Sequence, residues 1–262
     1  MDDTGKRDVV QLYNKVPAIT LVFWIIKVLA TTVGETFADV LSTTLKLGLT
    51  VTSWVMAALL VIALVIQVRS RKYVPTIYWI VVVLISVVGT LISDNLVDNL
   101  GVSLVTTSII FAVALAVVFA IWYRFERTLS VHTIYTTRRE LFYWAAILFT
   151  FSLGTSAGDL VSERLGLGYA LAALIFAAAI GVVVIAHRFG MNGILAFWIA
   201  YILTRPLGAS LGDLLTQART AGGLGLGTIG TSVIFLAVIV SLVIYLSREE
   251  KRHPLQPVAM QR

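Results

Sequence analysis

The feature that most constrains this chain is a tryptophan–glycine–aspartate pattern that recurs four times inside strongly apolar segments. In every copy the glycine follows the tryptophan by ten residues, and the aspartate follows the glycine by five. An ionisable side chain within a membrane-spanning segment is costly and marks a functional site by default. Four copies in register therefore predict a repeated architecture and its working surface. The copies are Trp24-Gly34-Asp39, Trp79-Gly89-Asp94, Trp144-Gly154-Asp159 and Trp198-Gly208-Asp213.

The composition indicates that most of the chain lies in lipid. Of the 262 residues, 58% are hydrophobic and only 13% are charged, whereas a soluble domain carries about 25% charged residues. Continuous apolar runs of about 20 residues, the length that crosses a bilayer as a helix, recur along the chain. They do not alternate in polarity as barrel strands would. We expect eight such helices, at roughly 18–40, 49–68, 75–95, 102–123, 140–160, 168–187, 192–214 and 228–247.

The repeat predicts how these helices are arranged. Each step from one motif tryptophan to the next contains two predicted helices, so the repeating unit is a helical hairpin. All four motif helices then cross in the same direction, and the repeats are parallel rather than inverted. We predict an all-α membrane protein whose four hairpins form a pseudo-four-fold or nested two-fold bundle. The single transmembrane domain, 17–247, holds repeats at about 17–70, 73–123, 138–188 and 191–247 between polar tails 1–16 and 248–262.

The net charge of +6 is concentrated on one side of the predicted membrane domain. Fifteen basic residues lie in the tails and in the connections on their side, against three in the opposite connections. By the positive-inside rule both termini are expected in the cytoplasm, with the bilayer and not nucleic acid as the partner. The fifteen are Lys6, Arg7, Lys15, Arg69, Arg71, Lys72, Arg124, Arg127, Arg138, Arg139, Arg188, Arg248, Lys251, Arg252 and Arg262, and the three are Lys46, Arg164 and Arg219.

The three motif positions suggest three different roles. The tryptophans lie near the cytoplasmic ends of their helices, where aromatic side chains typically anchor a protein at the membrane interface. Each glycine is followed four residues later by another small residue, a spacing that lets helices approach closely in lipid. The aspartates fall near the outer edge of the membrane, where the helix macrodipole disfavours a negative charge. A cation, a buried base, or a helix break that makes the aspartate an N-cap could compensate.

Three further charges lie within the apolar segments and break the four-fold pattern. Lys27 and Glu35 belong to the first repeat, and Arg205, which precedes a proline, belongs to the fourth. These two repeats would adjoin in a closed ring of four. With the four aspartates, five acids face two bases, so a bound cation or protonated acids are expected. In the alternative interpretation, Lys27 and Arg205 are buried counter-ions that hold helices in register.

Several segments together resemble a known family. The segments are Lys15-Val16-Pro17, Phe23-Trp24-Ile25-Ile26-Lys27, Ala30 to Thr36, Phe142-Tyr143-Trp144 and Leu203 to Gly208. They are similar to bacterial membrane proteins built of four tandem repeats of unknown function, in which each repeat holds two membrane helices and a tryptophan. The resemblance covers about residues 15–247. It implies a multi-pass protein of the bacterial inner membrane and no particular activity.

The pattern of acids favours a secondary transporter or exporter of a small cation, such as a proton-coupled divalent metal. Asp39, Asp94, Asp159 and Asp213 would bind the cation, metal or proton, since oxygen ligands suit hard cations. Glu35 would couple protons or act as a further ligand of the ion, and Lys27 and Arg205 would act as gating counter-charges. Two alternatives remain open. One is a non-transporting membrane scaffold, and the other is a transporter of a small anionic or zwitterionic metabolite bound by Lys27 and Arg205.

No catalytic residues and no cofactor are expected. The chain has no cysteine, which excludes thiolate chemistry. It contains no HExxH or GxSxG pattern, so neither a metalloprotease nor a serine hydrolase is indicated. We therefore do not expect an enzyme. The sequence leaves the substrate open, and also the oligomeric state, with a homo-oligomer among the alternatives.

Overall fold

The computed structural model describes residues 14–252, and eight helices in this range are long and apolar enough to cross a membrane. This confirms the predicted all-α fold with eight spans. Residues 1–13 and 253–262, most of the two expected polar tails, lie outside the described range, while residues 248–252 continue the last helix. The helices are α2 (Leu21–Asp39), α3 (Leu49–Arg69), α4 (Pro75–Asp94), α5 (Leu104–Glu126), α6 (Thr137–Asp159), α7 (Tyr169–Arg188), α8 (Gly193–Thr216) and α9 (Thr228–Arg252).

Short helical turns extend or connect the spans. Three π-helical turns follow directly on the motif helices α2, α4 and α6, each starting after the motif aspartate. Two 3₁₀ turns lie in the connections before α6 and α9. The π turns are η1 (Val40–Thr44), η2 (Asn95–Asn99) and η4 (Leu160–Arg164), and the 3₁₀ turns are η3 (Val131–Thr133) and η5 (Arg219–Ala221).

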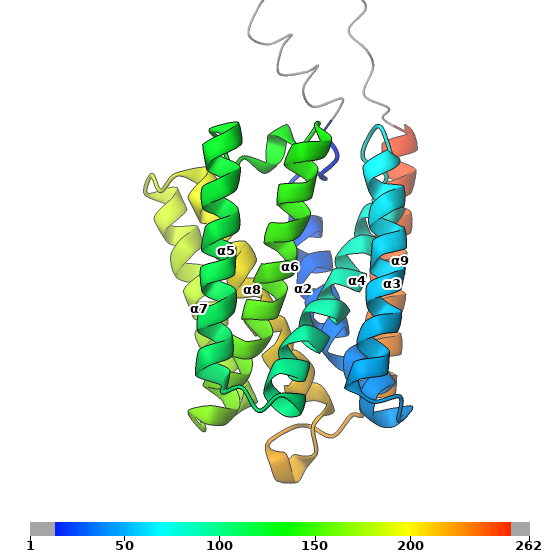
Figure 1. Cartoon of the computed structure of the whole chain (residues 1–262), viewed down its shortest axis with the longest axis vertical. Coiled ribbons are helices and arrows are strands. Elements are labelled where there is room, and N and C mark those ends of the chain that lie inside the picture. The colour runs from blue at the N-terminus through cyan, green and yellow to red at the C-terminus, as the bar shows by residue number, and fades with distance from the viewer. Residues whose placement is uncertain (1–13, 253–262) are drawn as a thin grey trace, which may run out of the picture.

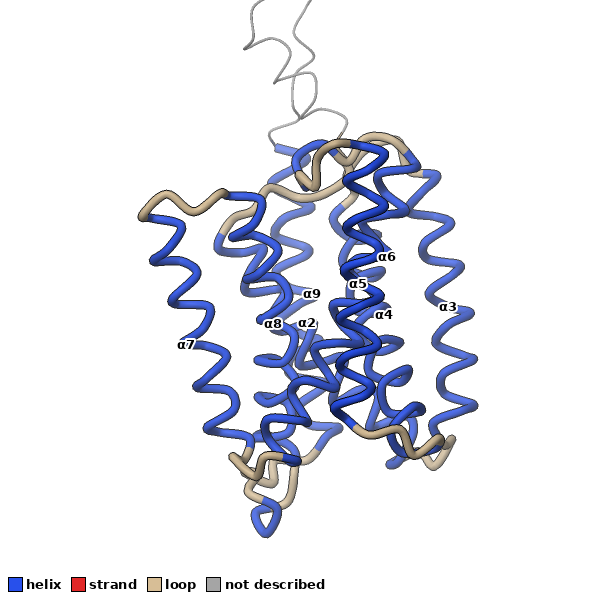
Figure 2. Tube along the Cα trace, turned by 60° about the vertical axis from the view of Figure 1, so that its left-hand side comes forward, coloured by secondary structure: helices blue, strands red, loops and turns tan. Residues whose placement is uncertain are grey.

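The four motif helices form an inner ring and the other four surround it (Figure 1). In the ring, α2 packs against α4, α4 against α6, α6 against α8, and α8 against α2. The inner spans are 61–67% buried and the outer spans only 17–28%, which separates protein-facing from lipid-facing helices. Figure 2 shows α3 and α7 on opposite flanks of the bundle. Closure of the ring brings the first and fourth repeats together, as expected for a closed ring of four.

The outer helices are exchanged between neighbouring repeats. α3 packs on α4, α5 on α6, and α7 on α8, so each outer helix covers the inner helix of the following repeat. α9 completes the cycle by packing on α2, whereas the two helices of any one repeat barely touch. The repeat is therefore a hairpin in chain order, but its packed unit joins two consecutive repeats.

The motif glycines set the spacing of the inner ring. Each faces the residue that stands three positions before the glycine of the next inner helix: Ser86 for Gly34, Phe151 for Gly89, Arg205 for Gly154 and Thr31 for Gly208. A Cβ atom added to Gly89 would lie 2.7 Å from the Cβ of Phe151, and the other three would be closer still to their neighbours. These contacts support the close-packing role predicted for the glycines. Their common direction gives the ring its pseudo-four-fold symmetry.

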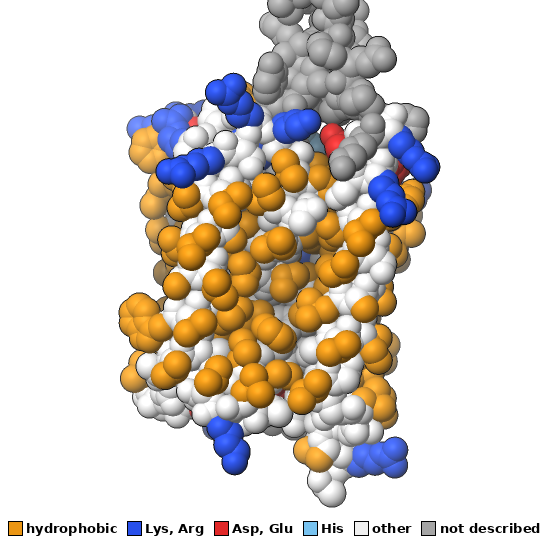
Figure 3. Space-filling view, turned by 90° about the vertical axis from the view of Figure 1, so that its right-hand side faces the viewer, with side chains coloured by type: hydrophobic (Ala, Val, Ile, Leu, Met, Phe, Trp, Pro, Cys, Tyr) orange, Lys and Arg blue, Asp and Glu red, His pale blue; other side chains and the backbone are white. Residues whose placement is uncertain are grey.

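The surface matches a protein immersed in lipid. Figure 3 shows apolar side chains over the middle of the bundle, with lysine and arginine gathered at the two ends and more of them at one. The first and last described residues lie at that same end (Figure 1). We call it the terminal end and the opposite one the aspartate end.

Candidate functional site

A cyclic cluster of aromatic side chains fills the inner ring near the terminal end. The residue before each motif tryptophan packs against the tryptophan of the next inner helix, with ring centroids 5.4–6.3 Å apart in the four pairs. We call these eight residues the aromatic belt. They are Phe23, Trp24, Tyr78, Trp79, Tyr143, Trp144, Phe197 and Trp198.

The predicted interfacial role of the tryptophans is wrong for three of the four. Trp79, Trp144 and Trp198 are only 2–4% exposed and lie in the protein interior, and Trp24 alone is partly exposed. Each of the three packs against an aromatic residue of the preceding inner helix, and Trp198 also contacts Phe119 and Trp122 of outer helix α5, so they pack against protein instead of lipid headgroups. Tyr78 and Tyr143 add a hydroxyl–hydroxyl hydrogen bond of 2.5 Å. The belt thus closes the ring at the terminal end.

Lys27 lies one turn beyond the belt and is almost completely buried. Its Nζ donates a hydrogen bond of 3.2 Å to Oγ1 of Thr204 and lies 4.2 Å and 4.4 Å from the ring centroids of Tyr201 and Phe151. Aromatic faces stabilise a cation at such distances. Within residues 14–252, no carboxylate forms a salt bridge with Lys27. It is therefore a buried base held by a hydroxyl and two rings.

Arg205 occupies the centre of the ring and is fully buried. Its Nη2 donates to Oε2 of Glu35 at 2.9 Å, to Oγ1 of Thr155 at 2.7 Å, and to Oγ1 of Thr90. Its Nη1 donates to the carbonyl oxygen of Thr31 at 3.3 Å. The Thr90 hydroxyl in turn donates to Oε2 of Glu35 at 3.2 Å. The Glu35–Arg205 ion pair joins α2 of the first repeat to α8 of the fourth.

Three of the four oxygen atoms around Arg205 come from equivalent repeat positions. Glu35, Thr90 and Thr155 each follow directly after the motif glycine of their own helix, and the fourth position is Ala209. Sequence reasoning missed the two threonines. Both also approach the carbonyl four residues earlier, as isolated helical threonines do, so nothing local distinguishes them. Alignment of the four glycines would have placed them in the same layer as Glu35.

The four motif aspartates gather at the aspartate end, about 22 Å along the helix from the belt at 1.5 Å per residue. Electrostatic interactions link Glu35 to each of the four, and further interactions connect the aspartates with one another. Asp213 is buried, and Asp39, Asp94 and Asp159 are partly exposed. Within the described part of the chain, no three His, Cys, Asp or Glu side chains stand close enough to hold a metal ion. A metal role for the aspartates stays a prediction.

The helices continue past the aspartates without a break at the glycines. The suggestion that these aspartates become N-caps is therefore wrong, since Asp39, Asp94 and Asp159 make no capping hydrogen bond. In three repeats the backbone instead widens into a π turn directly after the aspartate. Single π turns are rare overall, and those that occur are often found at functional sites.

A second buried ion pair lies at the terminal end and was not predicted. Nζ of Lys15 contacts Oε2 of Glu140 at 2.6 Å and the carbonyl oxygen of Val68 at 2.9 Å. Gln67 donates to the other carboxylate oxygen at 3.1 Å. These contacts tie the segment before α2 to α3 and α6. Lys15 had been counted only as a topology signal, and nothing in its surrounding sequence indicates burial.

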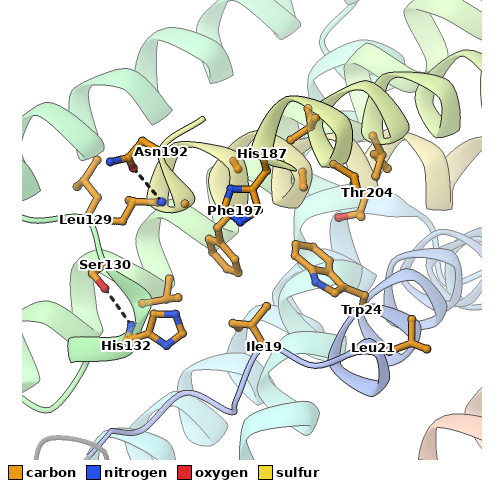
Figure 4. Close-up of a pocket in the computed structure, with 18 of the residues that line it drawn as sticks. Ile19, Leu21, Trp24, Leu129, Ser130, His132, His187, Asn192, Phe197 and Thr204 are labelled. Atoms are coloured by element: carbon orange, nitrogen blue, oxygen red, sulfur yellow. Dashed lines mark hydrogen bonds between the residues drawn. The ribbon is translucent and has the colours of Figure 1, made fainter. Parts of the chain in front are cut away.

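A lateral pocket of about 710 Å³ opens between α2, α7, α8 and the connection before α6. Figure 4 shows Trp24 and Thr204 on one side of it and Ser130 and His132 on the other. Its lining is mainly apolar, and His132, His187 and Arg188 are its ionisable members. Thr204 therefore joins this pocket to the buried Lys27.

Comparison with known proteins identifies the repeats. Four successive segments, residues 22–73, 77–128, 142–190 and 196–252, each match one family model, described as Repeat of Unknown Function (DUF347). No curated protein and no solved structure matches the chain.

Proposed function

Because the chain belongs to the DUF347 repeat family, which carries no assigned activity, we propose from its own geometry that it is a secondary transporter of a small cation. One observation carries the proposal. Five carboxyl groups, Glu35 and the four motif aspartates, interact with one another inside or beside a closed helix ring. Lys27 and Arg205 are the two bases of these inner helices between the belt and the aspartates. An excess of acid in a confined space attracts cations.

The two ends of the ring support a transport path with one closed side. Polar groups extend from the aspartates to Arg205, while the aromatic belt fills the opposite end. Transport would require the belt to open while the polar end closes, as in alternating access between helix repeats. The Glu35–Arg205 pair lies between these two regions, where a change in its charge state could couple one movement to the other.

The proposed setting is the inner membrane of a bacterium, with the terminal end in the cytoplasm. The excess of lysine and arginine at the terminal end supports this orientation. In it, the carboxyl cluster faces the outside and the aromatic belt faces the cytoplasm.

Cation flux into proteoliposomes tests the proposal. Purified protein should carry a cation such as Mn²⁺, Mg²⁺ or Na⁺ down its gradient, and Asp39→Asn or Asp159→Asn should reduce the initial rate at least tenfold. Glu249→Gln, at an exposed carboxylate near the terminal end of α9, is the control and should keep the wild-type rate. A folded protein that moves no cation, or a flux that both motif variants leave unchanged, would instead favour the scaffold role.

A second candidate function rests on Lys27 and the lateral pocket. Lys27 has no carboxylate partner among residues 14–252 and is joined through Thr204 to an apolar pocket with a basic rim, which suits the acidic head of an anionic amphiphile. A fluorescent long-chain fatty acid should then bind wild-type protein, and Lys27→Gln should weaken binding at least tenfold. Lys72→Gln, an exposed substitution, should not change it. Equal binding of the fatty acid and its methyl ester would contradict this candidate.

A further inference from the structure

The surroundings of Arg205 have the composition of a cation site. Four oxygen atoms converge on its guanidinium: a carboxylate oxygen of Glu35, the hydroxyls of Thr90 and Thr155, and the carbonyl of Thr31. They come from α2, α4 and α6, and the guanidinium comes from α8, so all four inner helices meet here. We call these four oxygens the oxygen cage. Carboxylate, hydroxyl and carbonyl oxygens are the ligands that hard metal cations prefer.

The charge of the oxygen cage matches a monovalent ion. Glu35 contributes one negative charge, while the two hydroxyls and the carbonyl are neutral. The guanidinium balances that charge with a single positive charge. A sodium ion would balance it equally, whereas a divalent ion would leave one positive charge uncompensated in a buried site, which is costly.

One hydrogen-bond donor of Arg205 has no partner when the guanidinium occupies the oxygen cage. Its Nε is buried and has no hydrogen-bond partner among the described residues. An unpaired buried donor destabilises the state that contains it. Pro206 follows directly inside α8 and cannot donate a backbone hydrogen bond, which loosens the helix at this point.

A second position for the guanidinium lies close by. Arg205 interacts electrostatically with Asp94 and Asp159, which stand one turn beyond the oxygen cage on α4 and α6. Movement toward these carboxylates would keep the arginine paired while it left the cage. The acids that face the site are then Glu35 on one side and the motif aspartates on the other.

We propose that Arg205 is a tethered competitor that holds the oxygen cage closed, and that Na⁺ binds there when the guanidinium moves toward Asp94 and Asp159. This deepens the proposed transport function and rests on it: Na⁺ would be the coupling ion, and its exchange with Arg205 would be the step that links ion binding to helix movement. Both states are electrically balanced, because one positive charge replaces another in the cage.

The test measures Na⁺ binding by thermal unfolding in detergent, with choline as the background ion. Arg205→Gln removes the competitor, so its melting temperature should rise saturably with Na⁺, at a midpoint at least tenfold below that of wild type. K⁺ and Mg²⁺ should give much smaller shifts. Glu35→Gln combined with Arg205→Gln removes the charge of the cage and should abolish the response. A folded Arg205→Gln protein without a Na⁺-specific shift overturns the inference.

A second set of variants covers the case in which Arg205→Gln fails to fold. Thr155→Val removes one cage oxygen and should raise the Na⁺ midpoint of the wild-type protein at least threefold. Thr107→Val is the matched control, because Thr107 is equally buried but lies on outer helix α5. An equal response of the two threonine variants contradicts the cage. Na⁺ binding without flux in proteoliposomes would support the cation site in the oxygen cage and contradict the transport function. Flux without Na⁺-specific binding would support transport and contradict the cation site.

Discussion

The aromatic belt and the layer around Arg205 lie in the same four helices, but only the belt keeps the four-fold symmetry. At the belt, each repeat supplies a tryptophan and an aromatic neighbour, so the same contact occurs four times around the ring. About 10 Å further along the helices, at 1.5 Å per residue, the four equivalent positions before the glycines hold Thr31, Ser86, Phe151 and Arg205. The packing contacts are therefore repeated around the ring, whereas the charged residues are not.

A physical limit explains the difference. Contacts between neighbouring helices can be repeated without conflict, because each occupies its own sector of the ring. A long charged side chain reaches the centre, where only one can fit. Two guanidinium groups 4 Å apart would repel each other by about 4 kcal/mol at an effective dielectric constant of 20. Symmetric helices can therefore hold one Arg205 and one Glu35, with small or neutral residues in the remaining positions.

The largest expected effect concerns the symmetric packing itself. Gly89→Leu places a side chain against Phe151 and Ser152 at an inner crossing that cannot widen without opening the ring. We expect loss of the folded, monodisperse protein in size-exclusion chromatography. Overpacking costs about 1–3 kcal/mol where side chains can adjust, and more where they cannot; here the added side chain meets the backbone of Phe151 and Ser152, so relief requires the ring to open and the loss should exceed that of the charge variants.

Gly181→Leu is the control for this variant, because Gly181 lies in α7 with open space around its Cβ position. It should purify like wild type. If both variants fold equally well, the motif glycines do not set the spacing of the ring.

The next largest effect concerns the Glu35–Arg205 ion pair, which occurs once in the ring. Glu35→Gln leaves Arg205 buried without a carboxylate, which typically costs about 3–5 kcal/mol. Thermal unfolding in detergent should show this loss. The double variant with Arg205→Gln should recover part of it, because no uncompensated charge remains. If the stability losses of the two single variants simply add in the double variant, Glu35 and Arg205 are not energetically coupled.

A smaller effect is expected at the terminal end, outside both layers. Glu140→Gln retains a polar partner for Lys15 and Gln67 but removes the charge of the ion pair. Lys15 would keep its hydrogen bond to the carbonyl oxygen of Val68, and its flexible side chain lies near the end of the bundle, where it can reach water. The loss should therefore stay near the ~1.5–3 kcal/mol of a hydrogen bond to a charged group, below that of Glu35→Gln. Unfolding curves of the two variants decide the order. A larger stability loss for Glu140→Gln would show that the ion pair at the terminal end contributes more to stability than the pair at the ring centre.

The smallest effect concerns a single contact of the belt. Trp144→Phe keeps an aromatic ring but weakens the contact with Tyr78, and aromatic pairs of this kind contribute about 0.5–1.5 kcal/mol. Trp54→Phe changes a tryptophan that is 76% exposed on α3 and should leave the melting temperature unchanged. Equal shifts for the two variants would show that the belt tryptophans behave like lipid-facing residues after all.

The sequence predicts depth in the membrane better than direction around a helix. Continuous apolar runs such as residues 51–68 were enough to find eight spans, and a closed ring of four repeats correctly placed the first repeat beside the fourth. The tryptophans were misassigned because the same depth serves an interfacial anchor and a buried belt. Nor does the chain indicate that α9 covers α2, because hydrophobic outer helices such as α3 and α9 look alike in sequence.

The closure of the inner ring by its first and last helices, α2 and α8, has a consequence for how the protein is made. Lys27 and Glu35 enter the membrane with the first helix, but their partners Thr204 and Arg205 follow 177 and 170 residues later. At about 5–20 residues per second, translation needs on the order of ten seconds or more to supply them. During that interval the nascent chain carries an unmatched base and an unmatched acid in the bilayer. A chain truncated before α8 would keep both unmatched, and quality-control proteases would have a lasting signal to act on.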